Sequence, residues 1–148
     1  MKIYIGADHN GFELKKRLLT YLQRNGYSVS DEGDLTLDPQ DDYPQFAAKV
    51  IMAMKASEDS DPRGLLICGS GQGICIAANR FKGIRAAVCG DVEEARAGRN
   101  DDDTNVLCLP ARMVNGDQAE SILKTWLETG FAGAARFKRR IMELDELG

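Results

Sequence analysis

A cysteine followed by a glycine-rich loop is the part of this chain best suited to chemistry. Cys68 ends the apolar run 64–68, and Gly69, Gly71 and Gly73 then alternate with polar residues before a helical pattern begins. Such a loop lets backbone N–H groups converge on an anion, and a helix N-terminus favours negative charge there. A thiol at a helix start also ionises more readily than a free one. The pattern indicates a thiol base beside an oxyanion site; the alternative is a small buried core residue.

The loop differs from the phosphate-binding loops of other enzymes. A P-loop ends in Lys-Ser/Thr, which is absent here, and a dinucleotide-binding loop needs glycine at position 74, where Ile74 stands. A tyrosine-phosphatase loop would need arginine at the same position. Stabilisation of an oxyanion next to the thiol is therefore the better interpretation.

Three other groups of residues could bind a ligand, and each has a simpler structural explanation. Asp8 and His9 follow the first apolar run and could contact a phosphate or a sugar hydroxyl, or could form a helix N-cap with a solvated histidine. Arg136 and Arg140 are spaced i, i+4 and could hold a phosphate, or could lie on a solvated helix face. The Asp101-Asp102-Asp103 run is typical of a turn or solvated loop.

Composition narrows the class of protein. The 148 residues carry a net charge of −4, so nucleic acid and anionic membranes are not expected partners. Four cysteines without a C-x-x-C spacing and a single histidine make a zinc site improbable; Cys75, Cys89 and Cys108 fall in apolar patterns typical of core positions. No apolar run is long enough for a signal peptide or a membrane span, so we expect free thiols in a cytoplasmic protein.

The elements that must position these residues alternate between strand and helix patterns, without a repeat or linker, so residues 1–148 are expected to form one domain. This alternation predicts an α/β fold, with a parallel sheet covered on both faces and ligands at the carboxyl ends of the strands. The predicted strands are 2–5, 27–31, 64–68, 84–89 and 105–109, and the predicted helices are 11–25, 44–56, 73–80, 91–98, 116–128 and 133–146.

Six segments in order resemble the ribose-5-phosphate isomerase B family, which also contains the galactose-6-phosphate isomerase subunits. They are GADHNGFELK at 6–15, DDYP at 41–44, ICGSGQGICIAAN at 67–79, GIRAAV at 83–88, DTNVL at 103–107, and Arg136-x-x-x-Arg140. The resemblance implies a single-domain, Rossmann-like three-layer sandwich with a five-stranded parallel sheet. It also implies a homodimer or dimer of dimers with active sites at the interface, a phosphorylated sugar as substrate, and neither metal nor organic cofactor.

The resemblance assigns roles to the candidate residues. It implies that Cys68 is the base for proton transfer between C1 and C2, and that Gly69 to Gly73, with the Ser70 side chain, hold the enediolate oxygen. Asp8 and His9 would contact the substrate, and Arg112, Arg136 and Arg140 would bind the phosphate. The remaining residues expected to contact substrate are Tyr43, Gly71, Gln72, Asn79 and Asp102.

One departure from the family pattern bears on the substrate. A histidine and an asparagine that many members carry, the histidine for opening the sugar ring, are replaced here by Asp101 and Asp102. Either Asp101 takes over as acid and base, or the substrate needs little ring opening. From the resemblance as a whole, we expect an isomerase of ribose 5-phosphate in the pentose phosphate pathway. The alternatives are an isomerase of a hexose 6-phosphate or tetrose phosphate, a non-catalytic sugar-phosphate-binding module, and one subunit of a hetero-oligomeric isomerase.

Overall fold

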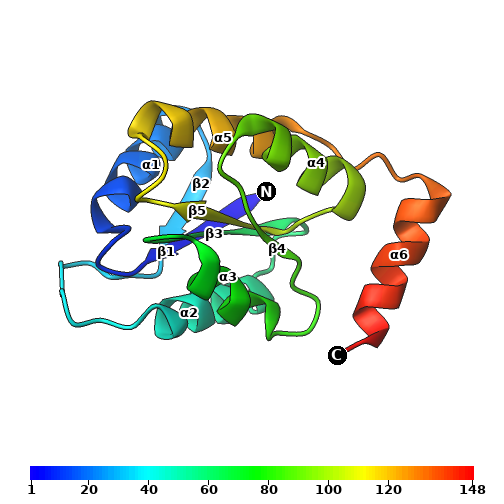
Figure 1. Cartoon of the computed structure of the whole chain (residues 1–148), viewed down its shortest axis with the longest axis horizontal. Coiled ribbons are helices and arrows are strands. Elements are labelled where there is room, and N and C mark those ends of the chain that lie inside the picture. The colour runs from blue at the N-terminus through cyan, green and yellow to red at the C-terminus, as the bar shows by residue number, and fades with distance from the viewer.

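Strands and helices alternate from the first residues of the chain. The computed structural model describes residues 1–148 and places a parallel sheet between two helical layers, as the sequence predicted (Figure 1). The strands are β1 (Lys2–Ala7), β2 (Ser28–Asp31), β3 (Pro62–Cys68), β4 (Ala86–Val88) and β5 (Val106–Pro110). The helices are α1 (Phe12–Arg24), α2 (Tyr43–Lys55), α3 (Gln72–Asn79), α4 (Val92–Asp102), α5 (Gly116–Glu128) and α6 (Ala135–Glu146).

The order of the strands places a topological switch point at the carboxyl ends of β1 and β3. The order is β2-β1-β3-β5-β4, with every pair parallel, so the chain moves outward from β1 to β2 and then returns to the other side of β1 with β3. The connections that leave β1 and β3 therefore diverge to opposite faces of the sheet. Ligands of open α/β sheets bind at such a point, outside the carboxyl ends of the strands.

Side-chain alternation along β3 divides the core into two layers. Leu65 and Ile67 are fully buried against α1, α4 and α5, whereas Leu66 and Cys68 face α2 and α3. Both faces of β3 are apolar because helices cover both, which explains the continuous run Leu-Leu-Ile-Cys in the sequence. The alternation also fixes Cys68, the last residue of the strand, on the side from which α3 begins.

Helix α4 ends later than the sequence predicted. We expected it to end at residue 98 and the aspartates to form a loop, but the helix continues through Asp102, and Asp103 caps it in a left-handed conformation with φ of 47°. Arg99 explains the extra turn, because its buried guanidinium donates to the carbonyl oxygen of Thr104 at 2.6 Å and to Asp103 Oδ1 at 2.8 Å. These bonds fold the end of the helix back onto the next strand.

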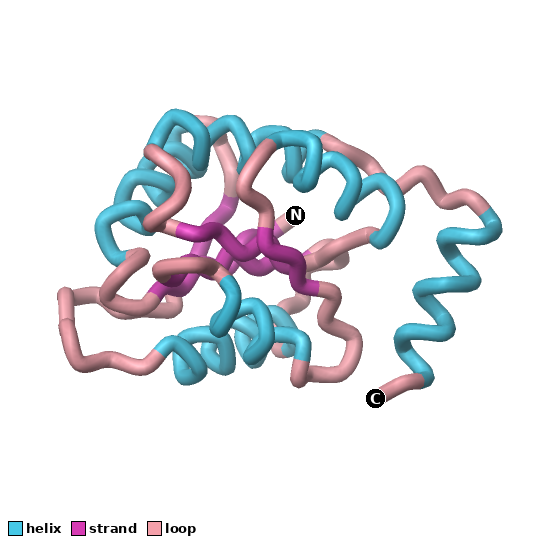
Figure 2. Tube along the Cα trace, viewed as in Figure 1, coloured by secondary structure: helices cyan, strands magenta, loops and turns pink.

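The last helix is unlike the other five. No residue of α6 is buried, and Met142, Leu144 and Leu147 at its end are all exposed. In the tube view α6 stands beside the three-layered body and follows a long connection, separate from the layers that cover the sheet (Figure 2). None of the helices has both the length and the apolar character that crossing a membrane requires.

Candidate active site

Cys68 lies at the carboxyl end of the central strand β3, at the switch point between β1 and β3. It is 5% exposed and packs in the same cluster as Cys75 and Cys108. The three other cysteines are buried, as expected for core positions. Burial raises the pKa of Cys89 to about 12 and raises the pKa of Cys108, whose thiol donates to Cys75 and thereby lowers the pKa of that thiol. Cys68 is thus the one cysteine that combines the strand end with the glycine-rich loop.

The loop after Cys68 presents unused backbone donors. No carbonyl group or side chain of the chain accepts from the N–H groups of Gly69, Ser70 or Gly71. Gly71 has φ of 75°, a left-handed conformation that disfavours other residues, and it caps the first turn of α3. The Ser70 hydroxyl accepts from the N–H of Gln72 at 3.4 Å. A developing oxyanion next to Cys68 would find several preorganised donors and the N-terminus of α3.

Two larger side chains cover the glycines of this loop. Arg112, which follows β5, lies so close to Gly69 that a Cβ there would be 2.9 Å from the guanidinium carbon. Tyr43, the first residue of α2, covers Gly73, where a Cβ would be 2.5 Å from the phenol ring carbon Cζ. The missing side chains therefore make room for a cation and an aromatic ring beside the loop that follows Cys68.

Asp8 and His9 follow the end of the neighbouring strand β1. Ala7 pairs with Ile67 in the sheet, and the Asp8 N–H donates to the Ile67 carbonyl at 3.2 Å, which sets the β1 tip beside the β3 tip. Asp8 Oδ1 accepts from the N–H groups of Asn10 and Gly11, so Asp8 also fixes the turn into α1. This turn-forming role of Asp8 is compatible with a contact between its side chain and the substrate.

Sequence reasoning missed the partner of His9. Asp41 Oδ1 accepts from the His9 backbone N–H at 2.9 Å and lies 2.8 Å from the ring atom Nδ1. Oxygen and nitrogen atoms of Asp8, His9 and Asp41 gather within 4.8 Å, a spacing that a metal site would also show. The contact at Nδ1 makes His9 and Asp41 an Asp–His pair in this structure. Asp41 lies in the DDYP segment, but its partner is 32 residues away and could not be read from spacing.

Five of the predicted site residues lie away from Cys68. Helix α4 starts at the carboxyl edge of the sheet and runs back, so Asp101 and Asp102 lie at the opposite edge. There the carbonyl of Asp102 accepts from Arg85 at 3.0 Å, and Asp101 Oδ1 accepts from Asn100 at 2.7 Å. The other three residues are all exposed: Arg136 and Arg140 lie on α6, and Asn79 lies at the end of α3.

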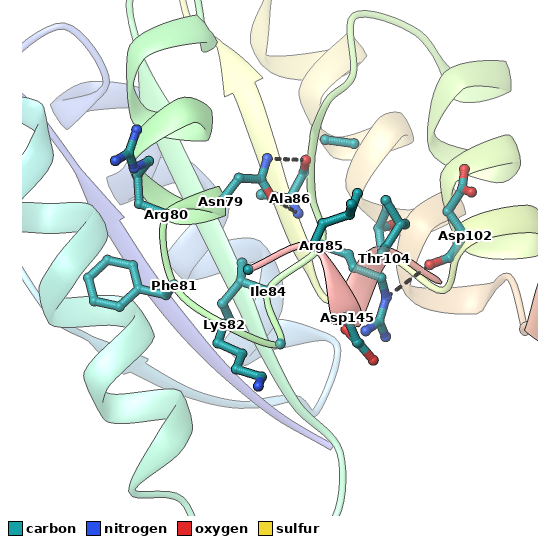
Figure 3. A pocket seen from close by; sticks show the side chains of 15 residues that line it. Asn79, Arg80, Phe81, Lys82, Ile84, Arg85, Ala86, Asp102, Thr104 and Asp145 are labelled. Carbon is teal, nitrogen blue, oxygen red and sulfur yellow. Dashed lines mark hydrogen bonds between the residues drawn. The ribbon is translucent and has the colours of Figure 1, made fainter. Parts of the chain in front are cut away.

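Asn79 has a structural role in this chain. Its side-chain amide donates to the carbonyl of Ala86 at 2.9 Å and accepts from the N–H of Ala86 at 2.8 Å, which ties the end of α3 to the start of β4 (Figure 3). Both polar atoms of the amide are therefore engaged at the amino edge of the sheet, remote from the loop after Cys68.

A wide cleft of the chain lies away from Cys68. It has a volume of about 540 Å³, includes residues 79–87, and has the end of α6, with Leu144 and Leu147, as a wall. Figure 3 shows Arg85, Asp102 and Asp145 around this cleft. The unused N–H groups, the thiol and the histidine all lie elsewhere, so we place the chemistry at Cys68 and treat this cleft as the space between the body and α6.

The chain is similar to known proteins over nearly its whole length. Residues 3–144 match the model of the family described as Ribose/Galactose Isomerase. The ribose-5-phosphate isomerase B of Clostridium thermocellum is 44% identical, with a TM-score of 0.93 over 99% of this chain and 97% of that one. The Mycoplasma genitalium enzyme, solved with bound ribulose-5-phosphate, is 37% identical, with a TM-score of 0.91 over 98% and 94%. A 4-deoxy-4-sulfo-D-erythrose isomerase of a Clostridium species is 39% identical over 88% of this chain and 81% of its own.

Proposed function

The chain belongs to the ribose/galactose isomerase family, and we propose that it interconverts ribose 5-phosphate and ribulose 5-phosphate with Cys68 as the base. The observation that carries this proposal is the position of a thiol at the end of β3, next to three backbone N–H groups that no other group of the chain uses. An aldose–ketose isomerase needs these two parts, a base for a carbon-bound proton and donors for the oxygen that becomes negative.

The reaction follows from the arrangement. The proton on C2 of a sugar aldehyde is weakly acidic, and the thiolate of Cys68 removes it while the electron pair moves to the carbonyl oxygen O1. The N–H groups of Gly69, Ser70 and Gly71 stabilise that oxygen in the enediolate. The thiol then returns the proton to C1, which gives the ketose. Arg112, beside Gly69, holds the phosphate, and this remote contact positions the reacting carbons.

One chain supplies only part of the expected phosphate site, and we propose that a second copy completes it. Arg136 and Arg140 are exposed on a helix with no buried residue, which also carries the exposed apolar residues Met142 and Leu144. In a two-fold dimer, α6 of one subunit would bring these arginines, and the end of α4 with Asp101 and Asp102, to the Cys68 of the other. The same contact would cover the apolar end of α6.

Subunit complementation tests the shared site. Cys68→Ala and Arg140→Ala are each expected to be nearly inactive as homodimers. Mixing them under conditions that exchange subunits makes half of the dimers mixed, and each mixed dimer keeps one intact site. Activity should therefore recover to about one quarter of the unmodified level. A mixture as inactive as its parts, despite demonstrated exchange, would place the whole site within one subunit.

The substrate proposal is tested by turnover of the purified chain. Ribose 5-phosphate should give the highest kcat/KM among pentose, hexose and tetrose phosphates assayed side by side, and iodoacetate should inactivate the enzyme unless ribose 5-phosphate protects it. Binding without turnover, and indifference to alkylation, would support a binding module instead. We place this reaction in the cytoplasm, where the four free thiols would stay reduced.

A four-carbon substrate is the second candidate, and a specific observation favours it. Asp101 and Asp102 stand where many relatives of this family have the ring-opening residues, and an aldotetrose phosphate cannot close the furanose ring through its phosphorylated oxygen. The sulfo-erythrose isomerase among the relatives has a four-carbon substrate in its name. A tetrose phosphate, or its sulfonate counterpart, turned over faster than ribose 5-phosphate would establish this alternative.

A further inference from the structure

Another cleft lies at the amino edge of the sheet, at the opposite ends of the strands from Cys68. It has a volume of about 330 Å³ and is formed by the segments before β3, β4 and β5 and by the ends of α2 and α4. Arg63 of β3 lines this cleft and precedes Cys68 by five residues, which separates the two by about 17 Å of extended strand. The cleft is therefore separate from the candidate active site.

The charge of this cleft is opposite in sign to that of the whole chain, which carries a net charge of −4. Asp61 and Asp103 are the two acidic residues that line it. Against them stand five basic residues: Lys55, Arg63, Lys82, Arg85 and Arg99. Figure 3 shows Lys82 and Arg85 on the segment that this cleft shares with the wider cleft beside α6. A local excess of positive charge in an acidic protein draws anions to that place.

Two of the arginines in this cleft are buried side by side. Arg63 is 6% exposed and Arg99 is 4% exposed. Their guanidinium carbons lie 5.2 and 5.9 Å from the centre of the same ring, that of Trp126. Burial, and then the positive charge of Arg63, lower the pKa of Arg99, while Asp103 acts in the opposite direction. Two like charges under the cover of the protein are costly unless acceptors surround them.

The acceptors of the chain do not satisfy both guanidinium groups. The two oxygens of Asp61 accept from Arg63, at 2.9 Å from Nε and 3.1 Å from Nη2, and Arg63 Nη1 is buried without a hydrogen-bond partner. Arg99 donates to the chain through Nε and Nη1 and makes no hydrogen bond through Nη2. The Trp126 ring offers π-electron density to both arginines but no lone pair. Each arginine thus keeps one donor end for which the chain has no acceptor.

We propose that this cleft is a second anion site, which binds a phosphate-type oxyanion at Arg63 and Arg99. A tetrahedral oxyanion has oxygens enough to accept from both arginines and from the exposed Lys82 at the rim. Its negative charge also offsets the repulsion between the two buried cations. The ligand is inorganic phosphate or the phosphate group of a small metabolite, and the volume of about 330 Å³ leaves room for the rest of a small molecule.

Trp126 provides a fluorescence signal that is specific to this cleft. It is the only tryptophan of the chain, and both buried arginines lie over its ring. The probes are sodium phosphate and glycerol 3-phosphate, titrated at constant ionic strength set with sodium chloride. Both should change the fluorescence in a saturable way, and the tighter of the two shows whether the free ion or a phosphate ester is the preferred form. A change that sodium chloride alone reproduces would reduce the effect to charge screening and overturn the proposal.

Substitutions separate this cleft from the phosphate contact that we assign to the active site. Arg63→Gln removes the charge but keeps a polar side chain, and Arg112→Ala is the matched loss of an arginine at the other edge of the sheet. Arg63→Gln should weaken phosphate binding in the fluorescence titration by at least about 10-fold and leave kcat and KM for ribose 5-phosphate unchanged. Arg112→Ala should leave the titration unchanged. The reverse pattern, or equal binding by Arg63→Gln and the unmodified chain, would overturn the proposal.

Two further measurements guard against indirect effects of Arg63→Gln on the indole or on folding. Calorimetry of phosphate binding to Arg112→Ala should detect the second site without a fluorescence signal, and adding Arg63→Gln to that variant should remove the heat of binding. The exposed Lys82→Gln leaves the buried pair intact and should weaken binding by about 2- to 5-fold, whereas Lys124→Gln, exposed on α5 outside the cleft, should have no effect. No binding to Arg112→Ala, or equal effects of the two lysine variants, would contradict an anion site in this cleft.

Discussion

Substitution of Gly69 by alanine should displace Arg112, the arginine that we propose binds the phosphate, while it leaves the thiol and the backbone donors in place. The added Cβ would lie 2.9 Å from Cζ of Arg112, 3.0 Å from Nε and 3.2 Å from Nη2, where ordinary contacts begin at 3.4 Å. The guanidinium must therefore retreat by about 0.5 Å, the difference between 3.4 and 2.9 Å. Gly69 is outside the left-handed region, so alanine strains the backbone little.

The size of the effect follows from what Arg112 contributes. A hydrogen bond to a charged group is worth about 1.5–3 kcal/mol, and a shift of half an ångström weakens such a bond without removing it. We expect a loss of about 1–2 kcal/mol in substrate binding, or a rise of roughly 5- to 30-fold in KM for ribose 5-phosphate. The kcat should change little, because Cys68 and the N–H groups of the loop remain.

A double-mutant cycle with a matched glycine tests this reasoning. Gly69→Ala, Arg112→Ala and the double variant are compared by steady-state kinetics, and Gly90→Ala serves as control, because its Cβ would meet nothing closer than a glutamate oxygen at 3.7 Å. Once Arg112 is absent, Gly69→Ala should have almost no further effect. The explanation is refuted if Gly69→Ala raises KM equally with and without the arginine, or leaves KM unchanged.

Three further outcomes are expected. Gly73→Ala should raise KM because its Cβ would collide with the Tyr43 ring at 2.5 Å. In a double-mutant cycle, Gly73→Ala should have little further effect on KM once Tyr43 is replaced by alanine. Trp126→Phe should lower the free energy of unfolding in urea by about 1 kcal/mol or more, because it removes the buried bond from Nε1 to Thr104 Oγ1 at 2.9 Å, while kcat stays unchanged. The pKa of His9 is raised in the folded chain by its hydrogen bond to Asp41. This pairing therefore stabilises the folded state fully below about pH 6.5, and the contribution is lost as the pH rises through the folded pKa. The difference in Tm between the unmodified protein and Asp41→Asn should accordingly be larger near pH 5.5 than near pH 8.5.

Periodicity predicted the fold because each strand and helix is apolar in the way that its place in the sheet requires. The run at 64–68 is buried on both faces of β3, and residues 116–128 form α5 with the apolar face and the Asn115 capping box that a helix start needs. The end of α4 was missed because three aspartates are typical of a turn. A buried arginine overrode that local preference through bonds to Asp103 and Thr104, which are visible only once the strand is in place.

The part of the candidate site that lies on one strand end and the loop after it was predictable from the sequence. Cys68 and the following glycines are contiguous, so their chemistry could be read from spacing, and Arg112 follows a neighbouring strand. The His9–Asp41 pair was not predictable, since the connection after β2 decides which aspartate of the DDYP segment turns inward. For Asp101, Arg136 and Arg140 the resemblance implied a place at a shared site, and folding of one chain does not bring them to Cys68.

The central claim is tested most directly by the turnover of ribose 5-phosphate by Cys68→Ala. Removal of the sulfur deletes the base and leaves the N–H groups, Arg112 and the His9–Asp41 pair in place. We predict a kcat at least about 10²-fold below that of the unmodified enzyme, with binding of the sugar phosphate retained in calorimetry. A Cys68→Ala variant that isomerises the sugar at the unmodified rate would contradict the assignment of this thiol as the base.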